Sequence, residues 1–108
     1  MASVALNNLN NMVKGWFCGK IEPCVLNTDF EVAVKKYSAG FQEEKHVHRI
    51  ATEITVIISG EVLMNGIRYV ENDIITIPPG VATDFKCITD TITCVVKDQS
   101  VMGDKYPV

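Results

Sequence analysis

The two histidines of the chain, His46 and His48, lie two residues apart and are followed closely by Glu53. Side chains at positions i and i+2 of a β-strand point to the same face, so both imidazoles would converge on one point. A neighbouring antiparallel strand that begins at Glu53 would bring its carboxylate beside the two rings. Two imidazoles and one carboxylate suit a first-row divalent ion with open coordination positions, and zinc accepts the same ligands. The spacing therefore predicts a site for a divalent ion: iron, manganese, nickel, copper or zinc.

The same three residues belong to a longer pattern, G-x5-H-x-H-x4-E-x6-G, which begins at Gly40 and ends at Gly60. This pattern is the first motif of the cupins, and the chain resembles a small single-domain member of this RmlC-like jelly-roll superfamily over about residues 30–97. The resemblance implies an antiparallel barrel of about six to ten strands, commonly dimeric, with the motif residues facing inward.

The second cupin motif, G-x5-P-x-G-x2-H-x3-N, is only partly present. Many cupins hold metal with three His and one Glu, and this chain has no third His. Three outcomes remain open: a metal completed by water, a thiolate ligand from Cys87, or a metal-free pocket in which the two His are hydrogen-bonded. The hydroxyl of Thr83 is a poor metal ligand, although it can hydrogen-bond a water or a substrate. The residues compared with the motif are Pro78, Pro79 and Gly80, which match its P-x-G core, and Asn72, Thr83 and Cys87, which replace its Gly, His and Asn.

Alternation along the expected strands adds residues to the predicted pocket. In the strand over 53–59 the odd-numbered residues share the face of Glu53, and the even-numbered residues, Ile54, Val56 and Ile58, pack on the other face. Because that other face is apolar too, we expect the N-terminal arm or a second subunit to cover it. The predicted pocket residues are Thr55, Ile57, Thr83, Phe85 and Cys87.

The strand over 30–37 bears the candidate catalytic groups. Its alternation turns either Lys35 and Tyr37 or Lys36 inward, and it does not choose between them. An inward lysine would bind an anionic substrate or act as an acid or base, whereas an outward lysine is merely solvated. Lys36 and Tyr37 are taken as the catalytic candidates. The charged run 43–45 is expected to be a solvated loop.

Short strands separated by turn signals predict an all-β fold, an antiparallel jelly-roll barrel. The dipeptide Asn65-Gly66 is the strongest hairpin signal, because a type I′ turn needs positive φ at both positions. Besides 30–37 and 53–59, strands are expected over 61–64, 67–70, 73–77, 81–88 and 91–97.

The chain divides into three expected parts. Residues 1–29 form an arm, a short helix or irregular chain with a strand near 15–20, that packs on its own barrel or is swapped between barrels. Residues 30–97 form the cupin barrel, and residues 98–108 form a C-terminal tail without regular structure. Trp16 and Phe17 would cover the outer face of the sheet or cap one end of the barrel.

Composition excludes several classes of protein. At 108 residues, 47% hydrophobic and with a net charge of −3, the chain is expected to be one globular domain. Scattered Lys and Arg argue against nucleic-acid binding, and no apolar run reaches the roughly 20 residues of a membrane span. Lacking a recognisable signal peptide, the protein is expected in the cytoplasm with reduced cysteines. Cys87 and Cys94 would form a redox pair if a hairpin placed them opposite each other, or would simply pack in the core.

These observations predict a homodimeric cupin that binds a small-molecule ligand. The leading hypothesis is a metal-dependent enzyme of isomerase, lyase or dioxygenase type acting on a small polar metabolite. The alternatives are a metal-free sugar-nucleotide isomerase or epimerase with a His base, and a metal-free binding or regulatory cupin. An inward titratable residue beyond the metal set would favour catalysis, whereas an apolar pocket would favour binding.

Overall fold

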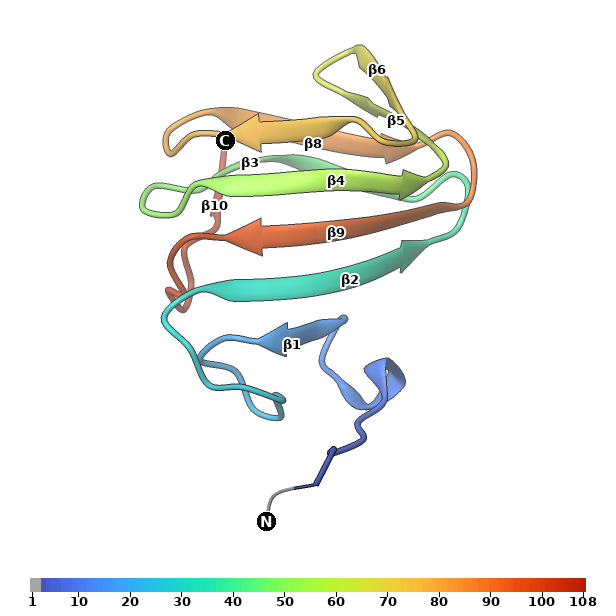
Figure 1. The fold of residues 1–108 in the computed structure, drawn as a ribbon. Helices are drawn as coiled ribbons and strands as arrows, with labels where there is room; N and C mark the ends of the chain where they lie inside the picture. Colours follow the sequence, from blue (N-terminus) through green and yellow to red (C-terminus); the bar gives the residue numbers. More distant parts are fainter. Residues whose placement is uncertain (1–2) are drawn as a thin grey trace.

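Two antiparallel five-stranded sheets make up the computed structural model, which describes residues 3–108 (Figure 1). Sheet A has the strand order β1-β2-β9-β4-β7, and sheet B has the order β10-β3-β8-β5-β6. This arrangement confirms the predicted antiparallel jelly-roll class. The strands are β1 Trp16–Cys18, β2 Glu31–Tyr37, β3 Gln42–Val47, β4 Glu53–Ser59, β5 Glu61–Met64, β6 Ile67–Val70, β7 Ile74–Ile77, β8 Ala82–Cys87, β9 Thr91–Lys97 and β10 Tyr106–Pro107.

Alternation along β4 separates the inside of the molecule from the outside. Thr55 and Ile57 are buried, whereas Ile54 and Ile58 on the opposite face are 37% and 47% exposed. The buried face of β4 packs into the main hydrophobic core, which accounts for its β-branched residues. That core consists of Ile57, Val62, Met64, Ile75, Ile77, Phe85 and Cys87.

Two turns depend on residues with positive φ. Asn65 and Gly66 have φ values of 51° and 77°, as the predicted type I′ hairpin requires. Asn72 stands where the second motif has Gly, and its φ is 74°. Asn is one of the few other residues that adopt this left-handed conformation readily, so the turn survives the replacement.

Two segments expected to be irregular form strands at the pocket edge. The charged run 43–45 belongs to β3, which pairs with β8 through a register shift between Glu43 and His46. The C-terminal tail contains β10, which pairs with the end of β3. Before β10, the buried carboxylate of Asp104 accepts hydrogen bonds of 2.8–3.2 Å from three consecutive backbone N–H groups, those of Arg49, Ile50 and Ala51. Sequence patterns miss this tail because its partners lie about fifty residues away.

The N-terminal arm contains the 3₁₀ turn Leu9–Asn11 and strand β1, which pairs with β2 at the edge of sheet A. Trp16 faces the interior between the sheets, so it does not cover the outer face of sheet A. In residues 3–108 there is no helix of the length and apolarity needed to cross a membrane.

The structure excludes the hairpin that would have placed Cys87 opposite Cys94. β8 belongs to sheet B and β9 to sheet A, so the connection between them crosses from one sheet to the other. Cys87 is fully buried in the core, and Cys94 pairs instead with Val34 and Val56. Both cysteines are free thiols. The sequence could not distinguish a hairpin from a crossover of similar length.

Candidate functional site

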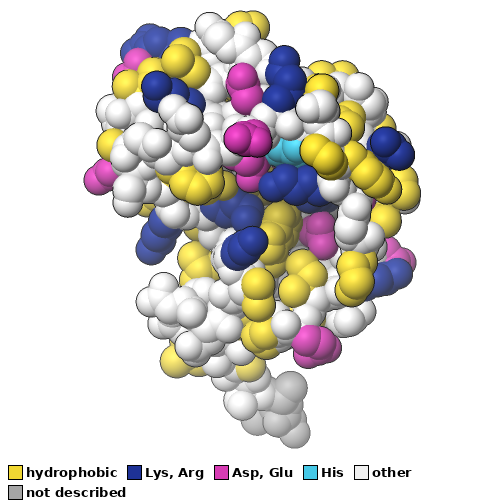
Figure 2. Space-filling view, turned by 180° about the vertical axis from the view of Figure 1, so that it is seen from behind, with side chains coloured by type: hydrophobic (Ala, Val, Ile, Leu, Met, Phe, Trp, Pro, Cys, Tyr) yellow, Lys and Arg dark blue, Asp and Glu magenta, His cyan; other side chains and the backbone are white. Residues whose placement is uncertain are grey.

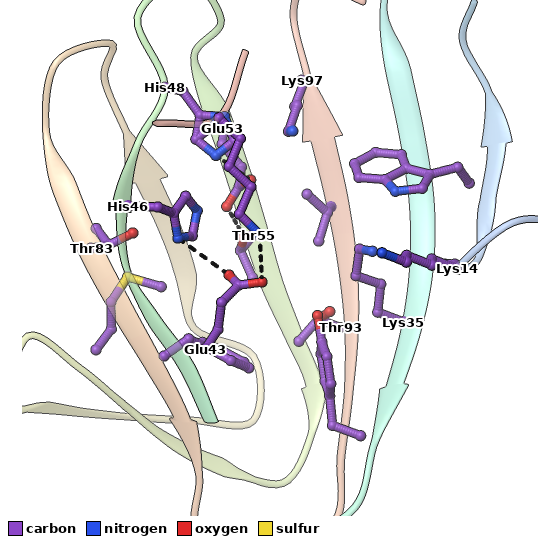
Figure 3. A pocket seen from close by; sticks show the side chains of 16 residues that line it. Lys14, Lys35, Glu43, His46, His48, Glu53, Thr55, Thr83, Thr93 and Lys97 are labelled. Carbon is purple, nitrogen blue, oxygen red and sulfur yellow. Dashed lines mark hydrogen bonds and ion pairs between the residues drawn. The ribbon is translucent and has the colours of Figure 1, made fainter. Parts of the chain in front are cut away.

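A cavity of about 250 Å³ lies between the sheets beside the apolar core. The face of the molecule in Figure 2 is hollowed, and basic, acidic and histidine side chains gather around the hollow. Two groups of residues line the cavity, and they meet where Lys97 lies across the β4–β9 ladder from Glu53 (Figure 3). We call His46, His48 and Glu53 the His–Glu cluster, and we call Lys14, Lys35 and Lys97 the lysine cluster.

His46 is held by the end of β3. Its Nδ1 lies 3.1 Å from the backbone carbonyl oxygen of Glu44 and 3.5 Å from Oε1 of Glu43. A ring that donates from Nδ1 to a backbone carbonyl or carboxylate presents an Nε2 lone pair, the arrangement usual for metal-bound histidines. Glu43 thus orients His46, although the sequence suggested that it was solvated.

His48 is only 5% exposed, and its Nδ1 is buried without a hydrogen-bond partner among the described residues. Its Nε2 lies 3.9 Å from Oε1 of Glu53, too far for a hydrogen bond. Burial lowers the pKa of His48, and the charge of Lys97 lowers it further. The ring is therefore biased toward the neutral form, which is the form that ligates metal. The carboxylate of Glu53 accepts a hydrogen bond from the hydroxyl of Thr55 at 3.1 Å.

The types and spacing of these groups suit a divalent ion. Two atoms bound to one ion at about 2.1 Å each lie about 3–4 Å apart, a span that includes the 3.9 Å between His48 and Glu53. The ring centroids of His46 and His48 are 5.1 Å apart, close enough for both rings to reach a shared ion. However, within residues 3–108 no three His, Cys, Asp or Glu side chains are arranged as a group that could hold a metal. The donor types of His46, His48 and Glu53 suit a metal, but the three side chains are not close enough together to form a coordination site.

The remaining predicted pocket residues divide between the cavity and the core. Thr55, Thr83 and Phe85 line the cavity, and Thr83 lies directly across the β3–β8 ladder from His46. Ile57 and Cys87 are completely buried in the hydrophobic core instead. Burial raises the pKa of the Cys87 thiol, so it is neither placed nor ionised as a thiolate ligand would need to be.

The structure resolves the ambiguity of the strand over 30–37. Lys35 and Tyr37 face the cavity, whereas Lys36 is exposed on the outer face and does not line it. The pKa of Lys35 is lowered, mainly by burial; Lys97 and Lys14 add to this, and Glu43 opposes it. Burial also raises the pKa of Tyr37, so its hydroxyl stays protonated.

Several cavity residues had no assigned role in the sequence. Thr93 and Lys97 share one face of β9, so the alternation of residues 91–97 could have found them. Lys14 and Lys105 come from the two terminal segments, where no local pattern indicates a direction. Lys105 forms an ion pair of 3.0 Å with Glu43 at the edge of the cavity.

No protein-family model and no curated protein matches the sequence. Solved structures do match. A protein with a double-stranded β-helix domain from Klebsiella pneumoniae is 26% identical, with a TM-score of 0.63 over 69% of this chain and 67% of that one. An RmlC-like cupin from Shewanella frigidimarina is 21% identical, with a TM-score of 0.63 over 72% of each chain.

The DMSP lyase DddQ from Ruegeria pomeroyi is also similar, with a TM-score of 0.70 and 21% identity. The match covers 86% of this chain but 49% of that one, so the likeness concerns about half of the lyase. These likenesses agree with the two jelly-roll sheets. The chain therefore has the double-stranded β-helix fold of the RmlC-like cupins.

Proposed function

We propose that this cupin binds a divalent metal ion through His46, His48 and Glu53 and acts on a small polar metabolite in the same cavity. The observation that supports the proposal is the convergence of the three motif residues on one cavity, where Nε2 of His48 lies 3.9 Å from a carboxylate oxygen of Glu53. A divalent ion between these two atoms would bind both of them.

When bound, the ion would act as a Lewis acid toward a carbonyl or carboxylate of the metabolite. The chain's own residues would perform the remaining tasks. Glu43 would hold the ring of His46, and Thr55 would hold the carboxylate of Glu53. The protonated hydroxyl of Tyr37 would donate a hydrogen bond or a proton, and it replaces Lys36 as the catalytic candidate. An isomerase, lyase or dioxygenase reaction is compatible with these groups.

A second candidate is a metal-free binding cupin. It is favoured by Thr83, which stands where the family motif has a third His, and by the separation of the three donors. In that case the two imidazoles would hydrogen-bond the ligand directly. The cavity is smaller than the roughly 300–1,000 Å³ of drug-sized sites, which favours a small metabolite under either candidate.

Metal content distinguishes the two candidates. Untagged protein purified without chelator should contain about one equivalent of a divalent metal by elemental mass spectrometry. The double variant His46→Ala/His48→Ala should lose it, and Lys36→Met, altered on the outer face, should keep it. Circular dichroism would establish that the double variant is folded. Absence of metal, even after incubation with each candidate ion, would leave the metal-free candidate.

We also propose that the chain forms a homodimer through the outer face of sheet A. Ile54, Ile58 and Ile74 leave apolar surface exposed there, and their exposed fractions are 37%, 47% and 69%. Light scattering after size-exclusion chromatography should give twice the chain mass of 11.9 kDa. A mass of one chain would exclude the dimer.

A further inference from the structure

The lysine cluster draws its three members from separate parts of the chain. Lys14 belongs to the N-terminal arm, Lys35 to β2 and Lys97 to the end of β9. All three line the cavity, and Figure 3 shows them on the side away from His46. The cavity therefore has a basic side, which begins at Lys97, directly across the β4–β9 ladder from Glu53, and extends away from His46.

Trp16 holds two of these lysines in position. The ammonium groups of Lys35 and Lys97 lie 4.7 Å and 5.2 Å from the centroid of the Trp16 ring. Lys35 also donates a hydrogen bond of 3.2 Å to the backbone carbonyl oxygen of Lys14. Cation–π contacts and this hydrogen bond fix the groups without neutralising their charge. The arm thus completes the basic side of the cavity.

The charges on this side are only partly balanced by carboxylates of the described residues. No ion pair within residues 3–108 includes Lys14 or Lys35. Lys97 has Glu31 at 4.0 Å, the outer limit of an ion pair. Across the cavity, Glu43 already pairs with Lys105 and His46. Like charges gathered in a partly buried site are unfavourable until an anion joins them.

A buried hydroxyl group lies beside the lysines. Thr93 is directly across the β2–β9 ladder from Lys35, so the two side chains share a face. Thr93 lines the cavity and is 1% exposed, and its Oγ1 lacks a hydrogen bond of normal geometry among the described residues, although the hydroxyl of Tyr37 lies beside it. A buried hydroxyl of this kind is usually satisfied. An oxyanion bound between the lysines would supply an acceptor for it.

We infer that Lys14, Lys35 and Lys97, with the hydroxyl of Thr93, bind the carboxylate or phosphate group of a small anionic metabolite. The rest of the metabolite then extends toward the His–Glu cluster, and this part of the inference rests on the proposed function. The substrate class is accordingly a small metabolite with an anionic group at one end and an oxygen function at the other. Three donors on a basic surface are typical of oxyanion recognition.

The test uses the full chain freed of metal by chelator, with inorganic phosphate and malonate as probes and glycerol as the uncharged control. Isothermal titration calorimetry should detect binding of at least one anion and none of glycerol. Preference for phosphate or for malonate identifies which anionic group the site takes. Lys35→Met and Lys14→Met should each weaken binding about ten- to a hundredfold, the effect of losing one charge-assisted hydrogen bond. Lys36→Met, its neighbour on the outer face, should bind like the natural protein.

The inference is overturned if neither anion binds, or if Lys36→Met weakens binding as much as Lys35→Met. Lys14 is exposed in the arm, so Lys14→Met keeps the test decisive even if Lys35→Met fails to fold. The experiments distinguish a failure of the anion site at the lysine cluster from a failure of the metal site at the His–Glu cluster. Anion binding that persists in His46→Ala/His48→Ala, together with absence of metal from the natural protein, would retain the lysine site and reject the metal.

Discussion

The His–Glu cluster and the lysine cluster face the same cavity but reach it by different routes. The first is confined to residues 46–53, on the end of β3 and the start of β4. The second spans residues 14–97 and depends on β1, β2 and β9 lying side by side in sheet A. A site built from one short segment can be found as a spacing pattern. A site built from distant strands becomes visible only when their order in the sheet is known.

The two clusters also suit ligands of opposite charge. Nε2 of His48 lies 3.9 Å from a carboxylate oxygen of Glu53, an arrangement that suits a cation. The three lysines gather positive charge that Glu31 balances only in part, an arrangement that suits an anion. A metabolite whose anionic end contacts the lysines and whose other end contacts the metal would satisfy both at once. Variants that change one cluster and leave the other intact can test this difference.

Asp104→Ala should have the largest effect and should act on the His–Glu side. Because Asp104 accepts from the N–H groups of Arg49, Ile50 and Ala51, its removal should lower the free energy of unfolding by about 3 kcal/mol. Asp98→Ala is the matched control, since Asp98 accepts one exposed N–H and should cost about 1 kcal/mol or less. Urea unfolding measures both, and equal losses would contradict the prediction.

The same carboxylate predicts a pH dependence. Burial alone would raise the pKa of Asp104, but the three backbone donors and His48 lower it overall. Its contribution to stability is thus complete above the ordinary pKa of 3.8 and is lost as the pH falls through the lower folded value. Asp104→Ala should lack this part of the acid transition.

Thr83→His should strengthen metal binding without affecting the lysines. The new imidazole would lie across the ladder from His46 and supply the third His of the family motif. We expect the dissociation constant for Zn²⁺ or Ni²⁺ to fall about tenfold or more, which is about 1.4 kcal/mol. Thr83→Gln adds similar bulk without a ligand and should give no gain. Equal metal binding by the two variants would contradict the prediction that a His at this position joins the ligand set.

Lys35→Met should have the smallest effect on stability, in the favourable direction. Burial disfavours the charged form of Lys35, so a neutral side chain that keeps the apolar stem should raise stability by about 0.5 kcal/mol. Because the folded pKa is lowered, stability of the natural protein should rise with pH toward 10.5, and the variant should lose this rise. Lys36→Met should show neither change, and a destabilised Lys35→Met would contradict the prediction.

The sequence by itself predicted the jelly-roll class, the Asn65–Gly66 hairpin and the inner face of β4. Each depends on contacts between near neighbours or on strand alternation, and both are determined by residues close together in the sequence. It also indicated that His46, His48 and Glu53 would approach one another.

Only the tertiary structure decided which face of β2 turns inward and that β8 and β9 belong to different sheets. It also decided that Lys14, Lys35 and Lys97 meet, and that Asp104 ties the C-terminal tail to the loop after His48. Alternation of residue types defines the two faces of a strand, but it does not say which face is buried. Burial of a face depends on the strands that pack against it, and these are far away in the sequence.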